Sequence, residues 1–304
     1  MKKLLLYLRE MRVPFFTASV IPVILGASAA WSQTGVFSPG LFALTLIAGM
    51  CLHAGTNVAN DYFDHKSGDD EINVEFVSPF TGGSRLIQKG LLSPRAVLIE
   101  ALVLFAVGGA IGVYLAATRG LVILLLGVIG AFCGFFYTAP PVNIAARGIG
   151  ELTVGLNFGT LMVLGAYYVQ AGRFSTAAFL ASLPVTLLIA DVLYINEFPD
   201  CAADKAVGKT HLVARLGKEK AAWGYLALTL AAYASILIPV MARAVPPYCL
   251  LGLVTFPLAM KAIKVAAANY ANSPKLAPAN AATIQLHMLT GLLVSVGFVL
   301  DRLL

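Results

Sequence analysis

Charged residues are scarce in this chain. They make up 12% of its 304 residues, while apolar residues make up 59%. An ordinary soluble domain carries about 25% charged residues. So little charge excludes a typical water-soluble globular protein, because there are too few charged groups to cover its surface.

Cysteine is also too rare and too scattered to form a structural framework. Cys51, Cys133, Cys201 and Cys249 lie mostly inside or beside apolar runs, and no CxxC pair occurs. A disulfide scaffold is therefore not expected. The histidines show no metal-ligand spacing either, and we expect them to be structural or solvated: His53, His65, His211 and His287.

Long apolar runs are what the chain has instead. A bilayer-spanning helix needs roughly 20 predominantly apolar residues. The runs are continuous and lack the alternation of a barrel strand, so we predict an all-α polytopic membrane protein with one domain over residues 1–304. The nine predicted spans are about 13–32, 40–60, 96–117, 121–138, 150–170, 177–198, 221–241, 247–266 and 282–301.

The N-terminal stretch MKKLLLYLREMRVPFF has a basic start and a short apolar run. Arg9, Glu10 and Arg12 interrupt this run, and no small-residue cleavage site follows. We therefore expect an interfacial segment at residues 1–12, a short helix on the membrane surface, and no signal peptide.

Lysine and arginine are distributed unevenly between the predicted connections. With a cytoplasmic N-terminus, only Arg119, Arg173, Arg243 and Arg302 of the 21 basic residues lie outside. The positive-inside rule thus predicts the N-terminus in and the C-terminus out, in a membrane such as a prokaryotic inner membrane. This topology accounts for the net charge of +6 without a nucleic-acid partner.

The long connections fall on the same predicted side. Residues 61–95, 139–149, 199–220 and 267–281 are expected to be cytoplasmic, whereas the external turns are short. We therefore expect the functional site on the cytoplasmic face.

The second predicted span ends in an acidic cluster, NVANDYFDHKSGDD. Asn57, Asp61 and Asp64 recur at helical spacing and share one face of a continuing helix. Gly68 would follow on this face, and Asp69 reaches the same point if the helix frays. For one such cluster alone, a solvated helix end is the plain alternative.

A similar cluster, NEFPDCAADKAVGK, ends the sixth predicted span. Asn196, Asp200 and Asp204 again share one helix face. The two clusters align Asn60 with Asn196, Asp61 with Glu197 and Asp64 with Asp200. Carboxylates near lipid are costly and mark a functional site by default. This quasi-repetition predicts two half-sites that face each other.

Converging carboxylates repel one another unless cations intervene. Oxygen ligands from Asp and Asn select a hard cation, and Mg²⁺ accepts carboxylates together with substrate phosphates. We therefore predict two acidic walls that hold Mg²⁺, with two ions expected, and through it a diphosphate.

Basic residues follow both clusters closely and are candidates for binding diphosphate oxygens. Arg85 is favoured, because Gly82 and Gly83 allow the backbone to approach a ligand. The positive-inside bias is the plain alternative for all of them. The candidates are Arg85, Lys89, Lys205 and Lys209.

Together these motifs resemble a known family. The pair NxxNDxxD and NxxxDxxxD, with TGGSR, YTAPP (137–141), RGIGE (147–151) and DKAVGKTHLVARLG, is similar to the UbiA superfamily of intramembrane aromatic prenyltransferases. The likeness covers nearly the whole chain, from Arg12 through the ninth span. TGGSR, YTAPP, RGIGE and LMVLGAYYVQAG most resemble the 1,4-dihydroxy-2-naphthoate prenyltransferases of the menaquinone pathway. Many family members have an Asp where this chain has Gly68, which leaves a metal role for Asp69 open.

The resemblance implies nine helices around a central cavity. It also implies Mg²⁺-dependent transfer of a polyprenyl chain from polyprenyl diphosphate to an aromatic acid acceptor. It assigns catalysis and metal binding to Asp61, Asp64, Asp200 and Asp204, with Asn57 and Asn196 alongside. Diphosphate binding falls to Asn57, Asn60 and Asn196 and to the four basic candidates.

Candidate acceptor contacts are Tyr137, Asn157 and Tyr167, although a tyrosine in a span more often packs or anchors it. Glu151 begins the fifth span and suits the N-terminus of that helix. Asp191 lies on the opposite side of its helix from Asp200, and it either pairs with a neighbouring helix or assists the acceptor.

Other functions fit part of this pattern. An ion-coupled transporter also has intramembrane carboxylates, but they lie near the midplane, whereas these acids lie at helix ends. A CDP-alcohol phosphotransferase would carry a DG…AR pattern, which is missing. Within the superfamily, 4-hydroxybenzoate, homogentisate, a chlorophyllide or glyceryl phosphate would require the same metal site.

Overall fold

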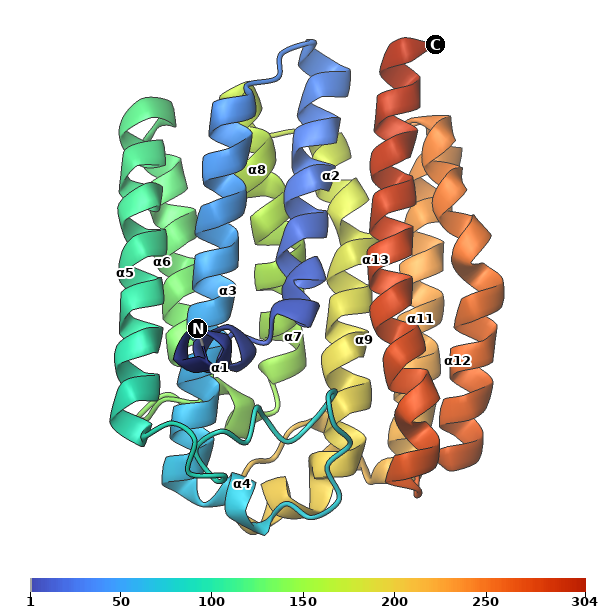
Figure 1. Cartoon of the computed structure of the whole chain (residues 1–304). Helices are drawn as coiled ribbons and strands as arrows, with labels where there is room; N and C mark the ends of the chain where they lie inside the picture. The colour runs from blue at the N-terminus through green and yellow to red at the C-terminus, as the bar shows by residue number, and fades with distance from the viewer. Residues whose placement is uncertain (1) are drawn as a thin grey trace.

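The computed structural model describes residues 2–304, which contain helices and no strand (Figure 1). The elements are α1 (Lys2–Glu10), η1 (Val13–Phe16), α2 (Thr17–Thr34), α3 (Pro39–Ser67), α4 (Asp69–Ile72), α5 (Pro94–Arg119), α6 (Leu121–Phe135), η2 (Ile144–Arg147), α7 (Gly150–Gly155), η3 (Leu156–Leu161), α8 (Met162–Ala171), α9 (Thr176–Ala206), α10 (Leu212–Leu216), α11 (Lys218–Met241), η4 (Pro247–Thr255), α12 (Phe256–Asn269) and α13 (Ser273–Leu303).

Within residues 2–304, eight helical stretches are long and apolar enough to cross a membrane, and α6 is a shorter apolar helix. The prediction of an all-α, multi-pass membrane protein is therefore confirmed. The outer faces of α5 and α6 expose large apolar side chains, among them Ile99, Val103 and Leu125. Such faces are stable against lipid, where apolar surface has no cost.

The two acidic motifs lie on regular helix. α3 continues to Ser67, seven residues past the predicted end of its span, and α9 continues to Ala206, eight residues past. Gly68 then ends α3 in the left-handed conformation, with φ of 81°. The long helices therefore carry the acidic side chains beyond the apolar layer on a fixed helix face.

Two predicted spans are less regular than expected. The fifth contains η3, a π-helical segment between α7 and α8. The eighth begins with the 3₁₀ helix η4 before α12 continues it. π-helical turns are rare and often occur at functional sites, and η3 lies against the cavity described below.

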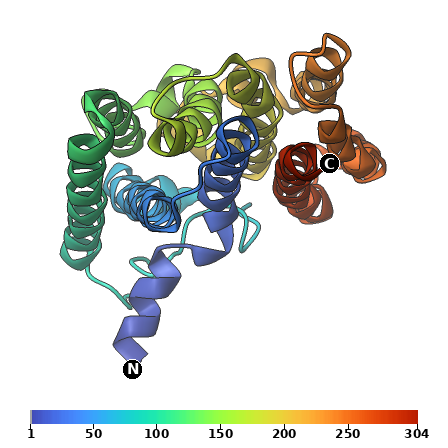
Figure 2. The ribbon, with the colours of Figure 1, turned by 90° about the horizontal axis from the view of Figure 1, so that it is seen from above.

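α9 is the central helix of the bundle. In an apolar 18-residue stretch of α9, 72% of the residues are buried inside the protein, compared with 22% in the corresponding stretch of α5 at the edge. Seen from above, α5 and α6 lie on one side of α3, α11 to α13 lie beyond α9, and α1 projects from the outline (Figure 2). The largest apolar core packs α9 against α11, α12 and α13.

The long connections gather at one end of the bundle, which we call the loop end (Figure 1). They are residues 68–93, 136–149 and 207–217. α1 lies across the bundle near this end and exposes Leu4 and Leu5. The interfacial role of residues 1–12 stays a prediction, and Met1 lies outside the described residues.

Close helix contacts depend on glycines without a side chain. A Cβ added at Gly26 of α2 would lie 2.3 Å from the carbonyl oxygen of Val163. One added at Gly109 of α5 would meet no atom within 4 Å. Gly26 is thus a packing glycine, whereas Gly109 lies beside open space.

This difference predicts unequal effects on stability. Gly26→Ala should lower the free energy of unfolding by about 1–3 kcal/mol, because a backbone atom cannot move aside cheaply. Gly109→Ala, the matched control on α5, should leave it unchanged or slightly higher. Thermal unfolding in detergent measures both, and equal melting temperatures would contradict this packing account.

Candidate functional site

Two contiguous cavities occupy the bundle. A larger one of about 550 Å³, the apolar chamber, extends between α3, α5, α6, α8 and α9. A smaller one of about 160 Å³, the polar chamber, lies at the loop end. Both are lined by Arg12, Asn60, Phe80, Tyr137, Leu193 and Asn196. An elongated molecule with a polar head and an apolar tail fits these two adjoining chambers.

The ammonium of Lys209 joins the two acidic motifs. Its Nζ lies 2.7 Å from Asp64 Oδ1 and 3.3 Å from Asp204 Oδ1, and it also forms an ion pair with Asp69. Although burial disfavours the charge, these three carboxylates raise the pKa of Lys209 well above its usual value. The predicted half-sites therefore do face each other.

Asp61 is held at the edge of the polar chamber. It forms an ion pair with Arg12, and the backbone N–H of Ser84 donates to its Oδ2 at 2.8 Å. Ser84 also donates from its hydroxyl to Glu10, which is buried. A Cβ at Gly83 would lie 3.0 Å from Asp61 Oδ1, so glycine is required there. These contacts tie the N-terminal segment and the TGGSR loop to α3.

Amide side chains hold the remaining carboxylates and one another. Asn73 donates to Asp200 Oδ1 at 2.7 Å, and Asn60 donates to Asp64 one turn along α3. Asn280 of α13 donates to the side-chain oxygen of Asn196 at 2.7 Å. Fixed amides of this kind orient the oxygens that face the chamber.

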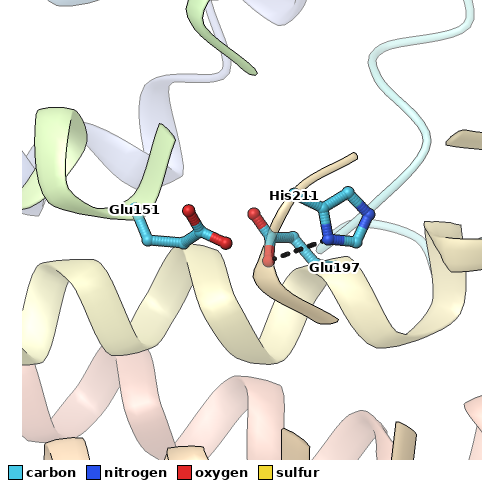
Figure 3. A group of neighbouring side chains, drawn as sticks. All are labelled: Glu151, Glu197 and His211. Carbon is cyan, nitrogen blue, oxygen red and sulfur yellow. Dashed lines mark ion pairs between the residues drawn. The ribbon is translucent and has the colours of Figure 1, made fainter. Parts of the chain in front are cut away.

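A second group consists of Glu151, Glu197 and His211, and it contacts Asp204 through His211. Figure 3 shows the two glutamates pointing toward each other from α7 and α9, with His211 beside Glu197. His211 lies 3.2 Å from Glu197 through Nδ1 and 3.2 Å from Asp204 through Nε2. Glu151 accepts the backbone N–H of Leu212 at 2.6 Å, which fixes the segment after His211.

The same three residues also meet a geometric requirement for metal binding. Their ligand atoms lie within 4.8 Å of one another. His211 is, however, already shared between two carboxylates. Burial lowers its pKa, but the contacts with Asp204 and Glu197 outweigh this and raise the pKa to about 10. Because His211 lies 3.2 Å from both Glu197 and Asp204, the geometry favours a role in orienting Asp204.

Acidic groups outnumber basic ones in the polar chamber. Six carboxyl groups and three basic side chains line it. Burial, with the charges of Asp64 and Asp61, raises the pKa of Asp70 to about 8, and burial raises that of Asp69 to about 7 despite Lys209. Oδ1 of Asp69 is buried without a hydrogen-bond partner. This oxygen-rich, electron-rich donor set suits a hard cation such as Mg²⁺.

Several predicted residues do not reach the chambers. Lys89 and Lys205 are exposed, and Arg85 lies 4.3 Å over the ring of Phe76. Tyr167 is buried, and its hydroxyl donates to Gln33 near the C-terminal end of α2, away from the loop end. None of these four candidates lines either chamber, although Arg85 is close enough to Asp70 for its charge to lower the pKa of that carboxyl.

Other candidates line one or both chambers, although Asn57, predicted to bind metal or diphosphate, lines the apolar chamber and not the polar one. Asn57 and Asn157 line the apolar chamber, and Tyr137 and Asn196 line both chambers. Asp191 is outside the site, as predicted from its helix face, and accepts the hydroxyl of Thr229 on α11 at 2.5 Å.

Sequence reasoning missed four side chains of the polar chamber: Arg12, Asp70, Asn73 and Glu197. His211 was expected to be structural or solvated; it is buried against Asp204 and is therefore not solvated. The motif alignment carried a signal for Glu197, which matches Asp61. Arg12 and Asn73 had no such signal, because long-range folding alone brings them to the acids.

The chain is similar to known proteins over most of its length. It is 32% identical over 245 residues to the 1,4-dihydroxy-2-naphthoate octaprenyltransferase of Mycobacterium tuberculosis, covering 80% of each chain. It is 27% identical to the enzyme of that name from Bacillus subtilis, and the match covers 94% of this chain and 89% of that one. It is 26% identical to the 2-carboxy-1,4-naphthoquinone phytyltransferase of Synechocystis, covering 96% and 92%.

Solved structures show the same fold. The apo UbiA homologue from Aeropyrum pernix K1 has a TM-score of 0.71 at 18% identity, covering 94% of this chain and 97% of that one. A homologue from Archaeoglobus fulgidus bound to GPP and Mg²⁺ has a TM-score of 0.60 at 15% identity, covering 95% and 99%. The family model of the UbiA prenyltransferases matches residues 19–292. With the paired acidic motifs and the helical bundle that carries them, this match shows that the chain belongs to the UbiA prenyltransferase family.

Proposed function

We propose that the protein transfers a polyprenyl chain from polyprenyl diphosphate to 1,4-dihydroxy-2-naphthoate, a step of menaquinone biosynthesis. The observation that carries this proposal is the continuity of an acidic polar chamber with an apolar chamber inside the bundle. The first suits a metal-bound diphosphate, and the second suits an isoprenoid tail. The names of the relatives from M. tuberculosis and B. subtilis support the naphthoate acceptor.

The proposed metal site uses the acids that converge on the polar chamber. Asp64, Asp69, Asp200 and Asp204 line it, and Asp61 lies at its edge. Two ions, one for each acidic motif, would balance the excess of carboxylates. When bound, Mg²⁺ supplies positive charge to the departing diphosphate. The Mg²⁺ in the A. fulgidus homologue supports this choice of metal.

The chain's own residues then bind and shield the reactants. Arg12 and Lys209 are the basic side chains positioned to hold diphosphate oxygens. The allylic C–O bond breaks with both electrons leaving on the diphosphate, and a ring carbon of the acceptor forms the new C–C bond. That carbon then loses its own substituent, a proton or the carboxylate as CO₂, and the bonding electrons return to the ring, which becomes aromatic again. The walls of the apolar chamber exclude water, which would otherwise capture the allylic cation.

A direct assay tests the proposal. Purified protein is given one polyprenyl diphosphate, Mg²⁺ and, in parallel, 1,4-dihydroxy-2-naphthoate, 4-hydroxybenzoate or homogentisate, and products are identified by mass spectrometry. We expect prenylated naphthoate product, none after chelation by EDTA, and recovery when Mg²⁺ is restored. Asp64→Ala and Asp200→Ala should lower turnover by about 100-fold or more.

The matched control is Asp301→Asn at the opposite end of the bundle, where the carboxylate accepts from Ser32. It should retain turnover. Product from another acceptor alone would reject the naphthoate assignment. Flux of a substrate across vesicles without product would favour a transporter, and near-normal activity of both aspartate variants would reject the metal site.

The contact between His211 and Asp204 leads to a separate expectation. His211→Ala should raise the Mg²⁺ concentration needed for half-maximal rate about 10-fold to 100-fold, because an unsupported carboxylate binds metal less well. His65→Ala, a partly exposed histidine paired with Glu71, serves as control. The proposed role of His211 fails if the Mg²⁺ dependence of the two variants is the same.

We also propose that the loop end faces the cytoplasm, with the N-terminus in and the C-terminus out, in a prokaryotic inner membrane. The strong bias of basic residues toward the connections at this end supports it. In a variant without native cysteines, an impermeant maleimide added to intact cells should label Leu304→Cys and spare Lys66→Cys. The reverse labelling pattern would invert the topology.

A further inference from the structure

One histidine lies deep in the apolar chamber, and the proposed chemistry gives it no role. His53 is 6% exposed and lines this chamber from α3. It precedes Asn57 by one helical turn, a rise of about 6 Å, so it lies just below the acidic motif on the same helix face. A polar ring here is costly unless it has a partner.

The protonation of this ring follows from its single hydrogen bond. Ser19 of α2 is fully buried, and its Oγ lies 2.8 Å from His53 Nδ1. Among the described residues this is the only hydrogen bond of the Ser19 side chain. We assign the hydroxyl proton to the bond with Nδ1, because the Ser19 hydroxyl has no other acceptor among the described residues. Nε2 then carries the ring proton, and no described residue accepts it.

Aromatic neighbours fix the ring in this orientation. Its centroid lies 5.5 Å from that of Phe16 and 4.7 Å from that of Phe158. Both phenylalanines hold the imidazole without offering a hydrogen bond. The donor at Nε2 is therefore presented to the chamber by a rigid ring.

An unpaired acceptor belongs to Asn157, which precedes Phe158 in η3 and also lines the apolar chamber. Its Nδ2 donates to the carbonyl of Thr153 at 2.9 Å, and its Oδ1 is buried without a partner. Rotation of the Asn157 side chain would bring this oxygen to the chamber, which is also lined by His53.

A polyprenyl tail would satisfy neither group, because it has no hydrogen-bonding atoms. A dihydroxylated aromatic ring would satisfy both. We propose that His53 and Asn157 form the acceptor subsite: Nε2–H of His53 donates to one ring oxygen, and a ring hydroxyl donates to Oδ1 of Asn157. This subsite rests on the proposed function. It selects rings with two oxygen substituents over rings with one.

The test compares the KM values of the two substrates. His53→Leu and Asn157→Leu should each raise the KM for 1,4-dihydroxy-2-naphthoate about 10-fold to 100-fold, the usual effect of leaving a substrate oxygen unpaired. The KM for polyprenyl diphosphate should stay within about twofold. His53→Gln, which keeps an N–H donor, should recover part of the loss.

An acceptor analogue identifies the contact. With naphthoates that lack one of the two hydroxyl groups, the wild type should lose affinity, and for one analogue His53→Leu should cause no further loss. The matched control is His287→Leu. His287 is also a buried histidine with an unpartnered Nε2, but it does not line the chamber, so the acceptor KM should not change.

Each outcome is decisive. An unchanged acceptor KM in His53→Leu, an equal rise in both KM values, or the same rise in His287→Leu overturns the subsite while leaving the proposed function intact. If His53→Leu does not fold, Asn157→Leu and His53→Gln carry the same test. Wild-type protein that transfers a prenyl chain to no aromatic acceptor overturns the proposed function and the subsite together.

Discussion

The site depends on keeping several carboxylates close together where little water reaches them. Like charges in such a place repel strongly unless cations are fixed among them. Lys209 supplies one such cation and contacts acids of both motifs, while Arg12 pairs with Asp61 and His211 lies between Asp204 and Glu197. The ion pairs of Lys209 link α3 to α9, and the remaining excess of carboxylates makes the chamber suitable for a hard cation.

The position of this chamber at the loop end has a chemical consequence. A diphosphate is strongly hydrated and cannot enter the middle of a bilayer, whereas an isoprenoid tail avoids water. The protein meets both requirements by joining a polar chamber to an apolar one through shared wall residues. In the proposed function, reaction at their boundary would leave the head group near water and the allylic carbon in a dry space.

Support for the acids comes from segments that are distant in the chain. The N-terminal segment contributes Arg12 and the buried Glu10, the TGGSR loop contributes the N–H of Ser84, and the segment after α9 contributes His211. Deep in the bundle, Ser19 of α2 orients His53 of α3. Each of these contacts joins elements that do not pack through apolar surface alone, so polar contacts fix the geometry in which function resides.

The sequence by itself determined the fold class and the two acidic half-sites. Apolar runs set the spans, and helical spacing placed Asp64, Asp200 and Asp204 on the faces that converge, because local periodicity fixes which side chains share a face. Only the tertiary structure decided which basic residues join them. Lys205 and Lys209 look equivalent in sequence, yet one is exposed and the other is buried among carboxylates. Pairing between distant segments leaves no local pattern in the sequence. The contacts of Arg12 and His211 with the acids could therefore be recognised only in the packed structure.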